Sequence, residues 1–378
     1  MMINSDNPQT ADPALRTPAL AENAERYAPL RVGLVGTGWV AHQHVAGYKS
    51  VSASNVAVVA ACDPREDVLE EFASRYSIPG RYVSATEMLE REELDAVVLL
   101  TPPAIRDEVI YPALERGKHL LIEKPFAVTG AKAAEYVTAA DAAGVQLAVS
   151  QNFRWFPEMQ WLASRLRSRD AGTPRYIDAR SFQNRPQQPG VWRANESKLE
   201  MAIFSIHLID RIQWLAPGAP TFVRAVTRRN VSSGLPGEQF TSLSVEFDDD
   251  MVADMVSSWM SIRLPLNDLR VDTDTGSASV SRTHPMSGEA IGAAHFSGSE
   301  PEYLQFQDSE NDTHSSQSYG GSMHAFAHAL RTGQPAAHSG RNNLRTMGIM
   351  EAAYLSADRG GAPVHVEEAL GPAWSVRN

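Results

Sequence analysis

The chain of 378 residues is poor in cysteine and has no long apolar run. Cys62 is its only cysteine, so no disulfide can form within the chain, as is typical of proteins from a reducing compartment. No stretch of 18 or more apolar residues occurs, which leaves no candidate for a membrane-spanning helix. Residues 1–28 are polar and lack the basic start and apolar core of a signal peptide. We therefore expect a cytoplasmic protein whose first 28 residues form a disordered or loosely docked tail.

Positive charge is also scarce. Lys and Arg number 34 against 45 Asp and Glu, a formal net charge of −11, which argues against a nucleic-acid partner and against an anionic membrane surface. No Gly-x-Ser-x-Gly motif supports serine hydrolase chemistry. The histidine pairs His42/His44 and His324/His328 lack an accompanying cluster of cysteines or carboxylates. Surface or packing roles suit them better, and we expect no metal site.

The first half of the chain alternates short apolar runs with amphipathic helical stretches. Apolar runs without polar alternation are typical of strands buried on both faces, as in a parallel sheet covered by helices. We predict an α/β domain of the Rossmann type, with a doubly wound parallel sheet, over residues 29–150. Its expected strands lie at 32–35, 56–62, 96–100, 119–122 and 145–149, and its expected helices at 67–76, 105–116 and 131–143.

The second half has a different pattern, in which apolar and polar residues alternate. This period of two predicts antiparallel strands with one buried face at 176–182, 222–227, 241–247 and 252–259. Helices are expected at 322–331 and 342–358, and residues 281–321 read as long loops with at most one short strand. We predict an α+β domain over 151–378, with a large, mainly antiparallel, open-faced sheet and last helices that pack back toward the first domain. The open face needs a cover, so we expect a homodimer or homotetramer formed through this sheet.

A glycine-rich loop follows the first expected strand. A strand that ends in Gly-x-Gly-x-x-Gly/Ala and leads into a helix is where a nucleotide-binding βαβ unit holds pyrophosphate. Asp63 ends the second strand, where an acidic side chain bonds the ribose hydroxyls of NAD, and Arg65 keeps NADP from being excluded. We predict a nicotinamide site that prefers NAD. The loop reads Gly36-Thr37-Gly38-Trp39-Val40-Ala41.

Two further motifs follow strands at the carboxyl edge of the predicted sheet, where open α/β folds bind ligands. One is Thr101-Pro102-Pro103, which taken alone is better explained as a plain turn. The other is Glu123-Lys124-Pro125. A lysine at this edge can donate a hydrogen bond to a substrate oxygen, and burial would lower its pKa enough for it to relay protons. Glu123 is a candidate for binding a cofactor hydroxyl or amide.

The order and spacing of these motifs resemble the glucose–fructose oxidoreductase, inositol dehydrogenase and MocA family. The resemblance runs from Arg31 to Val366 and includes further short motifs. It implies NAD(P)-dependent oxidation of a sugar, polyol or related hydroxy compound, with Lys124 and His207 at the positions of the family's lysine and histidine. The further motifs are Gly117-Lys118-His119, Asn152-x-Arg154, Ile206-His207-Leu208-Ile209-Asp210, Arg331-Thr332-Gly333-Gln334-Pro335 and Glu351-Ala352-Ala353-Tyr354-x-Ser356.

The chain departs from the family pattern at two positions. The aspartate one turn before the histidine is replaced by Ile203, and the histidine after the Thr-Pro-Pro loop by Arg106. Glu200, seven residues before His207, would lie two helical turns away on the same face and is the candidate substitute. We hypothesise that His207 is the acid/base, that Lys124 assists it and that Glu200 polarises the pair. The alternatives are a core histidine and a solvated charge at the start of a helix.

Four other side chains are candidates for contacts with ligands. Trp155, Trp192 and Arg193 suit a sugar pocket, because aromatic faces and guanidinium groups bind hydroxyl-rich ligands. Core packing explains either tryptophan equally well. Arg154 either contacts the cofactor or substrate, or pairs with a carboxylate at the domain junction.

The sequence thus predicts an NAD-dependent oxidoreductase that moves hydride between nicotinamide and a carbinol carbon of a sugar, sugar acid, cyclitol or glycoside. One alternative is a redox-neutral enzyme that oxidises a sugar hydroxyl transiently, allows elimination or isomerisation, and then reduces the carbonyl. The replacement of the aspartate by Ile203 raises this possibility. A non-catalytic NAD-binding regulator is the third reading.

Overall fold

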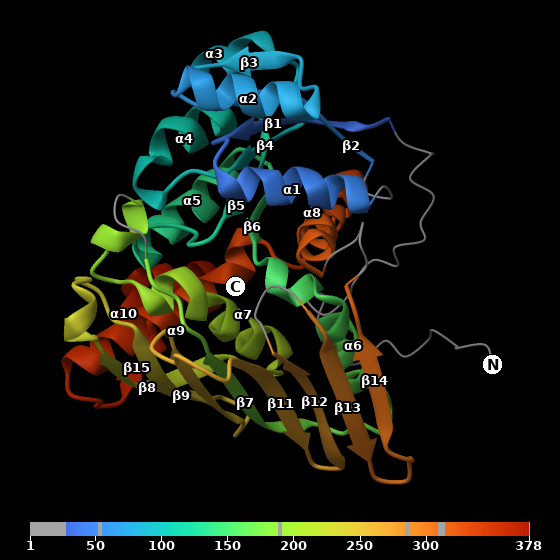
Figure 1. Cartoon of the computed structure of the whole chain (residues 1–378), viewed down its shortest axis with the longest axis vertical. Coiled ribbons are helices and arrows are strands. Elements are labelled where there is room, and N and C mark those ends of the chain that lie inside the picture. Colours follow the sequence, from blue (N-terminus) through green and yellow to red (C-terminus); the bar gives the residue numbers. More distant parts are fainter. Residues whose placement is uncertain (1–27, 52–54, 188–190, 284–287, 309–313, 378) are drawn as a thin grey trace.

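A computed structural model describes residues 28–377 except 52–54, 188–190, 284–287 and 309–313. The tail expected at residues 1–28 thus falls, apart from its last residue, outside the described residues. Two sheets with their helices make up the described chain, one from each half of the sequence (Figure 1). No described helix is both long and apolar enough to cross a membrane.

The first sheet is parallel throughout, as predicted, with strand order β3-β2-β1-β4-β5-β6. The order reverses between β1 and β4, which is the switch point where such sheets bind ligands. The strands are β1 (Leu30–Val35), β2 (Val56–Cys62), β3 (Gly80–Tyr82), β4 (Ala96–Leu99), β5 (His119–Glu123) and β6 (Leu147–Ser150). The helices are α1 (Trp39–Ser50), α2 (Glu66–Tyr76), α3 (Ala85–Arg91), α4 (Asp107–Glu115) and α5 (Gly130–Ala142).

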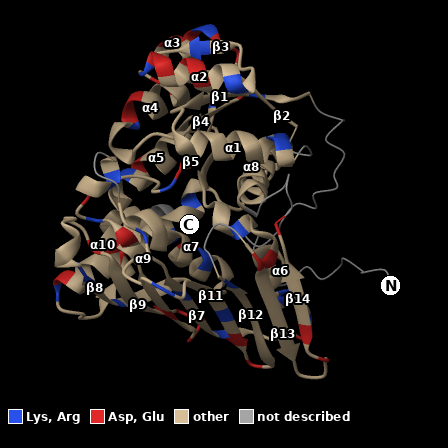
Figure 2. Cartoon of the chain, in the orientation of Figure 1, with Lys and Arg blue, Asp and Glu red and all other residues tan. Residues whose placement is uncertain are grey.

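Burial explains why the apolar runs became strands. All four residues of β4 and of β6 are buried, because helices cover both faces of the sheet. The sequence did not predict β3 or α3. A three-residue strand at the sheet edge has too few apolar positions to form a recognisable run. Figure 2 shows Lys and Arg together with Asp and Glu on the outer helices α2 and α3 and on β3, far from the second sheet.

The second sheet has nine strands in the order β14-β13-β12-β11-β7-β10-β9-β8-β15. Its pairs are antiparallel except β7 with β10, which confirms the mainly antiparallel prediction. Its strands are β7 (Pro174–Phe182), β8 (Pro220–Arg228), β9 (Phe240–Phe247), β10 (Val252–Ser258), β11 (Leu266–Thr273), β12 (Gly276–Arg282), β13 (Ala290–Phe296), β14 (Glu302–Phe306) and β15 (Val364–His365).

The segment 281–321 differs from its prediction as long loops. It contains the strands β13 and β14 and the start of α8 (His314–Thr332), and part of it lies outside the described residues. β13 is built mainly from Gly, Ala and a histidine, and the side chains of β14 are at most half-buried. These segments become strands by pairing, β13 with β12 and β14 with β13, and neither carries a strong apolar pattern.

Helices cover one face of the second sheet. Contacts of α6 (Pro157–Leu166) with β12 and β13, of α7 (Ile206–Leu215) with β7 and β10, and of α9 (Gly340–Asp358) with β8 form this layer. α8 lies against α1, and α9 also contacts α5, so both long C-terminal helices reach the first half of the chain (Figure 1). The chain ends in the short helix α10 (Val366–Leu370) and a 3-10 segment. Alternating burial along β9 leaves the opposite sheet face without a described covering element.

Candidate active site

The loop between β1 and α1 is shaped for an anion. Gly36 has a φ of +98°, which favours glycine, and a Cβ there would lie 3.1 Å from the carbonyl carbon of Leu100. Gly38 precedes α1 and no side chain caps the helix. The first turn contains no acidic residue, and a Cβ on Gly38 would meet nothing within 4 Å. The open, positively polarised helix end fits the pyrophosphate of a dinucleotide.

Asp63 lies beside this loop. Its Oδ2 accepts hydrogen bonds of 3.0 Å from the backbone N–H and the hydroxyl of Thr37, and Arg65 donates to both carboxylate oxygens at 2.9 Å. Burial acts to raise the pKa of Asp63, but the hydrogen bonds from Arg65 and Thr37 outweigh it and lower this pKa to about 2. An ionised carboxylate here fits ribose hydroxyls as donors. The Arg65 side chain is 59% exposed, so a ligand can displace it.

A pocket of about 170 Å³ opens between the carboxyl edge of the first sheet and the helix layer of the second. It brings together ten of the predicted site residues, from segments up to 168 positions apart. These are Trp39, Val40, Thr101, Pro102, Pro103, Glu123, Lys124, Trp192, Arg193 and His207. The other lining residues are Leu100, Arg106, Pro125, Phe153, Arg185, Ile203, Phe204 and Tyr319.

Lys124 is buried and directs its Nζ toward the second half of the chain. Nζ donates a hydrogen bond of 2.6 Å to the backbone oxygen of Ile203. Burial and the nearby guanidinium groups of Arg185 and Arg193 lower its pKa to about 8, against the opposing charge of Glu123. At neutral pH this amine is therefore mostly protonated, and it loses its proton as the pH rises through about 8. Ile203, where the family has aspartate, contributes its backbone instead of a carboxylate.

Glu123 has protein partners on both carboxylate oxygens. Oε1 lies 2.9 Å from Nε2 of His44, and Oε2 accepts the backbone N–H of Lys124 at 3.0 Å. Nδ1 of His44 lies 2.8 Å from the hydroxyl of Tyr48. Burial acts to raise the pKa of Glu123, but the hydrogen bond and charge of His44 outweigh it, so this pKa is lowered. Sequence reasoning had assigned His44 only a surface or packing role. The structure places it behind Glu123, where it orients the Lys124 loop.

His207 lies at the pocket wall with its ring stacked on Phe153, at 4.0 Å between centroids and 4° between planes. Its Nδ1 is 3.2 Å from Oε1 of Gln151. In this orientation of the Gln151 amide, its oxygen accepts the Nδ1 proton, which leaves the lone pair on Nε2. Burial and the positive charge of Lys124 lower the pKa of His207 well below 6.5. The neutral ring is in the form that accepts a proton.

The contacts of Glu200 correct its expected role. Its carboxylate accepts hydrogen bonds of 2.6–2.7 Å from the hydroxyls of Ser205, Thr241 and Ser257, and among the described residues Gln151 is the hydrogen-bond partner of His207. The prediction assumed one α-helix, but residues 201–205 form a π-helix, whose wider turn shifts Glu200 off the face of His207. Glu200 is also fully buried, which removes the reading as a solvated charge.

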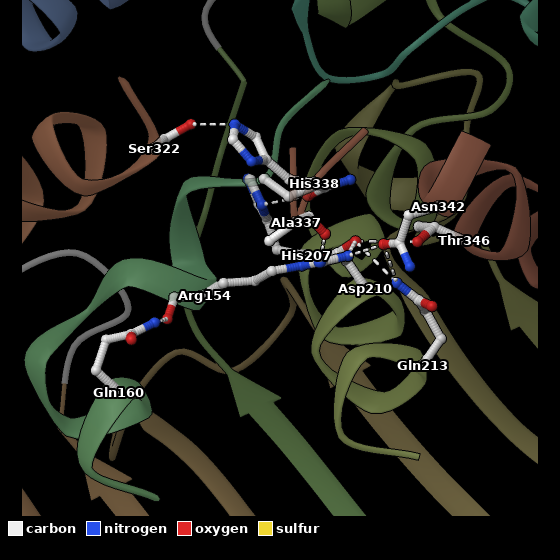
Figure 3. A network of polar contacts seen from close by, with 11 residues as sticks. Arg154, Gln160, His207, Asp210, Gln213, Ser322, Ala337, His338, Asn342 and Thr346 are labelled. Atoms are coloured by element: carbon white, nitrogen blue, oxygen red, sulfur yellow. Dashed lines mark hydrogen bonds and ion pairs between the residues drawn. The ribbon is translucent and has the colours of Figure 1, made fainter. Parts of the chain in front are cut away.

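Arg154 takes the second of its two predicted roles, the pairing with a carboxylate. Figure 3 shows it reaching Asp210, to which Nε and Nη2 donate bonds of 2.6 Å, with both side chains 1% exposed. Arg154 also donates to the backbone oxygen of Ala337 and to Asn342, and Thr346 donates to Asp210. With these donors engaged away from the pocket lining, the expectation that Arg154 binds the cofactor is corrected.

Trp155 and Trp192 have different roles: Trp155 packs in the core and Trp192 lines the pocket. Trp155 is buried, packs edge-on against His338 at 5.6 Å and is absent from the described pocket lining, so it is a core residue. Trp192 lines the pocket and is 38% exposed, which places it at the rim.

Arg106 replaces the family histidine and connects two loops. Its Nε and Nη2 donate to the backbone oxygen of Thr101, and its Nη1 donates to the backbone oxygens of Pro125 and Phe126. Burial lowers the pKa of Arg106 to about 10, which leaves it charged at neutral pH. Its side chain therefore holds the Thr-Pro-Pro loop against the Lys124 loop and has a structural task.

Sequence reasoning missed three residues of the site: Arg185 and Phe153, which line the pocket, and Gln151, which is hydrogen-bonded to His207. Gln151 is the residue directly after β6, at the same sheet edge as the Lys124 loop, and this position was the available signal. Arg185 stands in no motif, and Phe153 is only the unspecified residue of Asn152-x-Arg154, so nothing in the sequence indicates that either lies at the pocket.

Solved structures with this fold include enzymes crystallised with nicotinamide cofactors. An oxidoreductase from Agrobacterium radiobacter, in complex with NAD⁺, L-tartaric acid and magnesium, superposes with a TM-score of 0.79 at 20% identity, covering 90% of this chain and 99% of that one. The aldose-aldose oxidoreductase from Caulobacter crescentus, complexed with glycerol, gives 0.76 at 20% identity, with 89% and 99% covered. These likenesses establish a shared fold.

Comparison of sequences, unlike comparison of folds, identifies the family of this chain. A D-apiose dehydrogenase of Paraburkholderia graminis is 28% identical over 334 residues, covering 86% of this chain and 87% of that protein. The model of an oxidoreductase family with an NAD-binding Rossmann fold matches residues 30–151, and the model of the GFO/IDH/MocA C-terminal domain matches residues 159–279. Together the two models span more than half of the chain, which belongs to the GFO/IDH/MocA family of oxidoreductases.

Proposed function

We propose that this protein is an NAD-dependent dehydrogenase that transfers hydride between nicotinamide and a carbinol carbon of a sugar, sugar acid, cyclitol or glycoside. The observation that carries the proposal is the pairing of two groups at one pocket. His207 is neutral with Nε2 free to accept a proton, and Lys124 is a buried amine whose pKa is lowered to about 8. The kinship with a D-apiose dehydrogenase supports the choice of a hydroxylated substrate.

Each group has a distinct task. Nε2 of His207 removes the hydroxyl proton, and Gln151 holds the ring in the required tautomer. The ammonium of Lys124 donates a hydrogen bond to the substrate oxygen and stabilises the negative charge that develops there. Bound NAD⁺ supplies the hydride acceptor. Stacking on Phe153 restricts rotation of the imidazole, so its lone pair stays directed at the reacting hydroxyl.

The cofactor would lie across the switch point of the first sheet. Gly36, Thr37 and Gly38, with the start of α1 at Trp39 and Val40, would hold the pyrophosphate. Asp63 would accept the ribose hydroxyls, which favours NAD, and Arg65 leaves NADP open. Thr101, Pro102 and Pro103 would pack beside the nicotinamide. We assign residues 29–150 to this cofactor domain and 151–378 to the substrate and oligomerisation domain.

The test uses the purified protein, NAD⁺ and a panel of sugars, sugar acids, cyclitols and glycosides. Absorbance reports reduced nicotinamide, and mass spectrometry identifies the carbon product in the same wells. We expect reduced cofactor together with a ketone or lactone. His207→Ala should lower kcat by about 10²- to 10⁴-fold. The matched control His295→Ala, at an exposed position on β13, should not change it.

Other outcomes would contradict the proposal. Full activity of His207→Ala would show that His207 is not the acid/base of the reaction. Product formed without net reduced cofactor identifies the redox-neutral enzyme. NAD binding without turnover on any compound, with no consequence of replacing Lys124, identifies a regulator.

A further inference from the structure

The charge of the pocket is opposite to the charge of the chain. The whole sequence has a formal net charge of −11, with 34 basic and 45 acidic residues. Among the charged residues that line the pocket, four are basic and one is acidic. They are Arg106, Lys124, Arg185 and Arg193, against Glu123.

Three of these five charged side chains form close hydrogen bonds within the protein. Arg106 donates to backbone oxygens of two loops, and Nζ of Lys124 donates to the backbone oxygen of Ile203. Glu123 is bonded on one oxygen to His44 and on the other to the amide of Lys124. Glu123, the only acidic side chain among the described lining residues, is thus bonded to groups other than the two remaining guanidinium groups.

Arg185 and Arg193 form no ion pair with any described residue. The guanidinium of Arg185 lies between the rings of Phe204 and Trp259, at 5.2 and 5.1 Å from their centroids. Ring contacts use the faces of a guanidinium and leave its N–H edge available. Among the described residues, the Arg193 guanidinium donates one long hydrogen bond, 3.4 Å from Nε to Oε1 of Gln187, and lies 6.0 Å from the ring centroid of Trp192.

The carboxylate whose charge acts on Arg185 forms no ion pair with it. Glu200 is close enough to act on Arg185 electrostatically, yet its two oxygens are bonded to the hydroxyls of Ser205, Thr241 and Ser257. Burial and the adjacent Arg193 lower the pKa of Arg185 to about 10, which means that the protein alone disfavours two cations at this place. An anionic ligand would relieve that repulsion.

We propose that the substrate is a hydroxylated carboxylate, a sugar acid, whose carboxylate is bound by Arg185 and Arg193 while the hydroxyl to be oxidised faces Lys124 and His207. A guanidinium matches the two oxygens of a carboxylate in a bidentate pair. The inference rests on the proposed function and narrows its substrate class. Arg193 would have a second effect, because its positive charge at the pocket of an otherwise negatively charged protein would steer an anion into that pocket.

The experiment compares compounds that differ by one carboxylate. Gluconate is paired with glucitol and glucuronate with glucose, and shorter aldonates are paired with their polyols. Calorimetry with the protein and NADH measures binding, and steady-state assays with NAD⁺ measure kcat and KM. We expect each preferred acid to bind at least about 10-fold more tightly than its neutral partner, as charge-assisted hydrogen bonds allow.

Variants identify the groups responsible. Arg185→Met and Arg193→Met should each raise Kd and KM for the acid by about 10- to 100-fold, with little change in kcat and none for the neutral partner. Arg185→Lys should recover part of the loss. Arg91→Met is the matched control, because Arg91 lies exposed on α3 and is paired with Glu87.

Three results would overturn the inference. In one, no acid of the panel binds more tightly than its neutral partner. In another, the preference for acids survives in a variant that carries both Arg185→Met and Arg193→Met. In the third, the variants shift the pH profile of kcat for all substrates alike, which means that the arginines only tune Lys124. Failure of the proposed dehydrogenase function is recognised separately, because calorimetry detects carboxylate binding even when no reduced nicotinamide forms.

Discussion

At the scale of single residues, proton affinity separates the two groups at the pocket. Burial lowers the pKa of both His207 and Lys124, since both are cationic when protonated. The ordinary pKa of a histidine is 6.5, and a pKa well below this value leaves His207 neutral at pH 7. Lys124 starts from 10.5, is lowered to about 8 and stays mostly protonated. The same physical cause thus leaves one group able to accept a proton and the other able to donate a hydrogen bond.

The pH dependence of turnover follows from this difference. A donor role for Lys124 requires its ammonium form, so kcat/KM should fall as the pH rises through about 8. Lys124→Arg keeps the charge at every accessible pH, and the alkaline fall should disappear even if the maximal rate is lower. Initial rates between pH 6 and 10 provide the measurement. An alkaline limb that persists unchanged in Lys124→Arg would assign it to another group.

At the scale of elements, the two glycines of the loop are needed for different reasons: Gly36 for folding and Gly38 for cofactor binding. Gly36→Ala is strained by its positive φ and by the carbonyl group of Leu100, and should cost about 1–3 kcal/mol of stability. Gly38→Ala has free space around its Cβ and should fold normally. It should instead weaken NAD binding, because the methyl group enters the space of the pyrophosphate. Thermal unfolding and NAD titration test both variants, and unchanged NAD affinity in Gly38→Ala would place the pyrophosphate elsewhere.

The π-helix at Met201–Ser205 is held by a buried carboxylate. Removing it in Glu200→Ala leaves three buried hydroxyls without their acceptor, which should cost on the order of 3 kcal/mol of stability. Burial also raises the pKa of Glu200 to about 6. A raised folded-state pKa adds stability that is complete below the unfolded value of about 4.5 and is lost as the pH rises through about 6.

Glu200→Gln tests this pH dependence because it keeps the shape of the side chain and cannot ionise. The melting temperature of the variant relative to wild type should increase between pH 4.5 and 6.5. A difference that is constant with pH would show that the carboxyl group does not titrate in this range.

At the scale of the whole molecule, the open face of the second sheet is where we place subunit contacts. A groove on this face is lined by alternate residues of neighbouring strands, among them Tyr176, Arg224, Ser242 and Val256. We expect light scattering to give two or four times the chain mass of 41.3 kDa. Val256→Arg, at the centre of the face, should reduce the assembly toward the monomer. A wild-type mass of one chain would exclude this assembly, and Ile262→Arg, at an exposed loop position, serves as the control.

Most of the fold follows from local pattern. Apolar runs marked five of the six strands of the first sheet, because burial on both faces leaves no polar position in them. Period-two alternation marked four strands of the second sheet. The other five, β11 to β15, were not predicted. β13 is built mainly from Gly and Ala, and β14 from largely exposed residues, so neither contributes a clear apolar pattern.

What the sequence by itself determined is the class of fold, the dinucleotide loop, Asp63 and the placing of Lys124 at the sheet edge. These features are local, since a strand, a turn and the start of a helix lie within a few residues of one another. Only the tertiary structure decided which groups meet. His44 joins Glu123 across 79 positions and Gln151 joins His207 across 56. One π-helical turn was enough to direct Glu200 away from the histidine, because helical phase is set by backbone hydrogen bonding that spacing alone does not reveal.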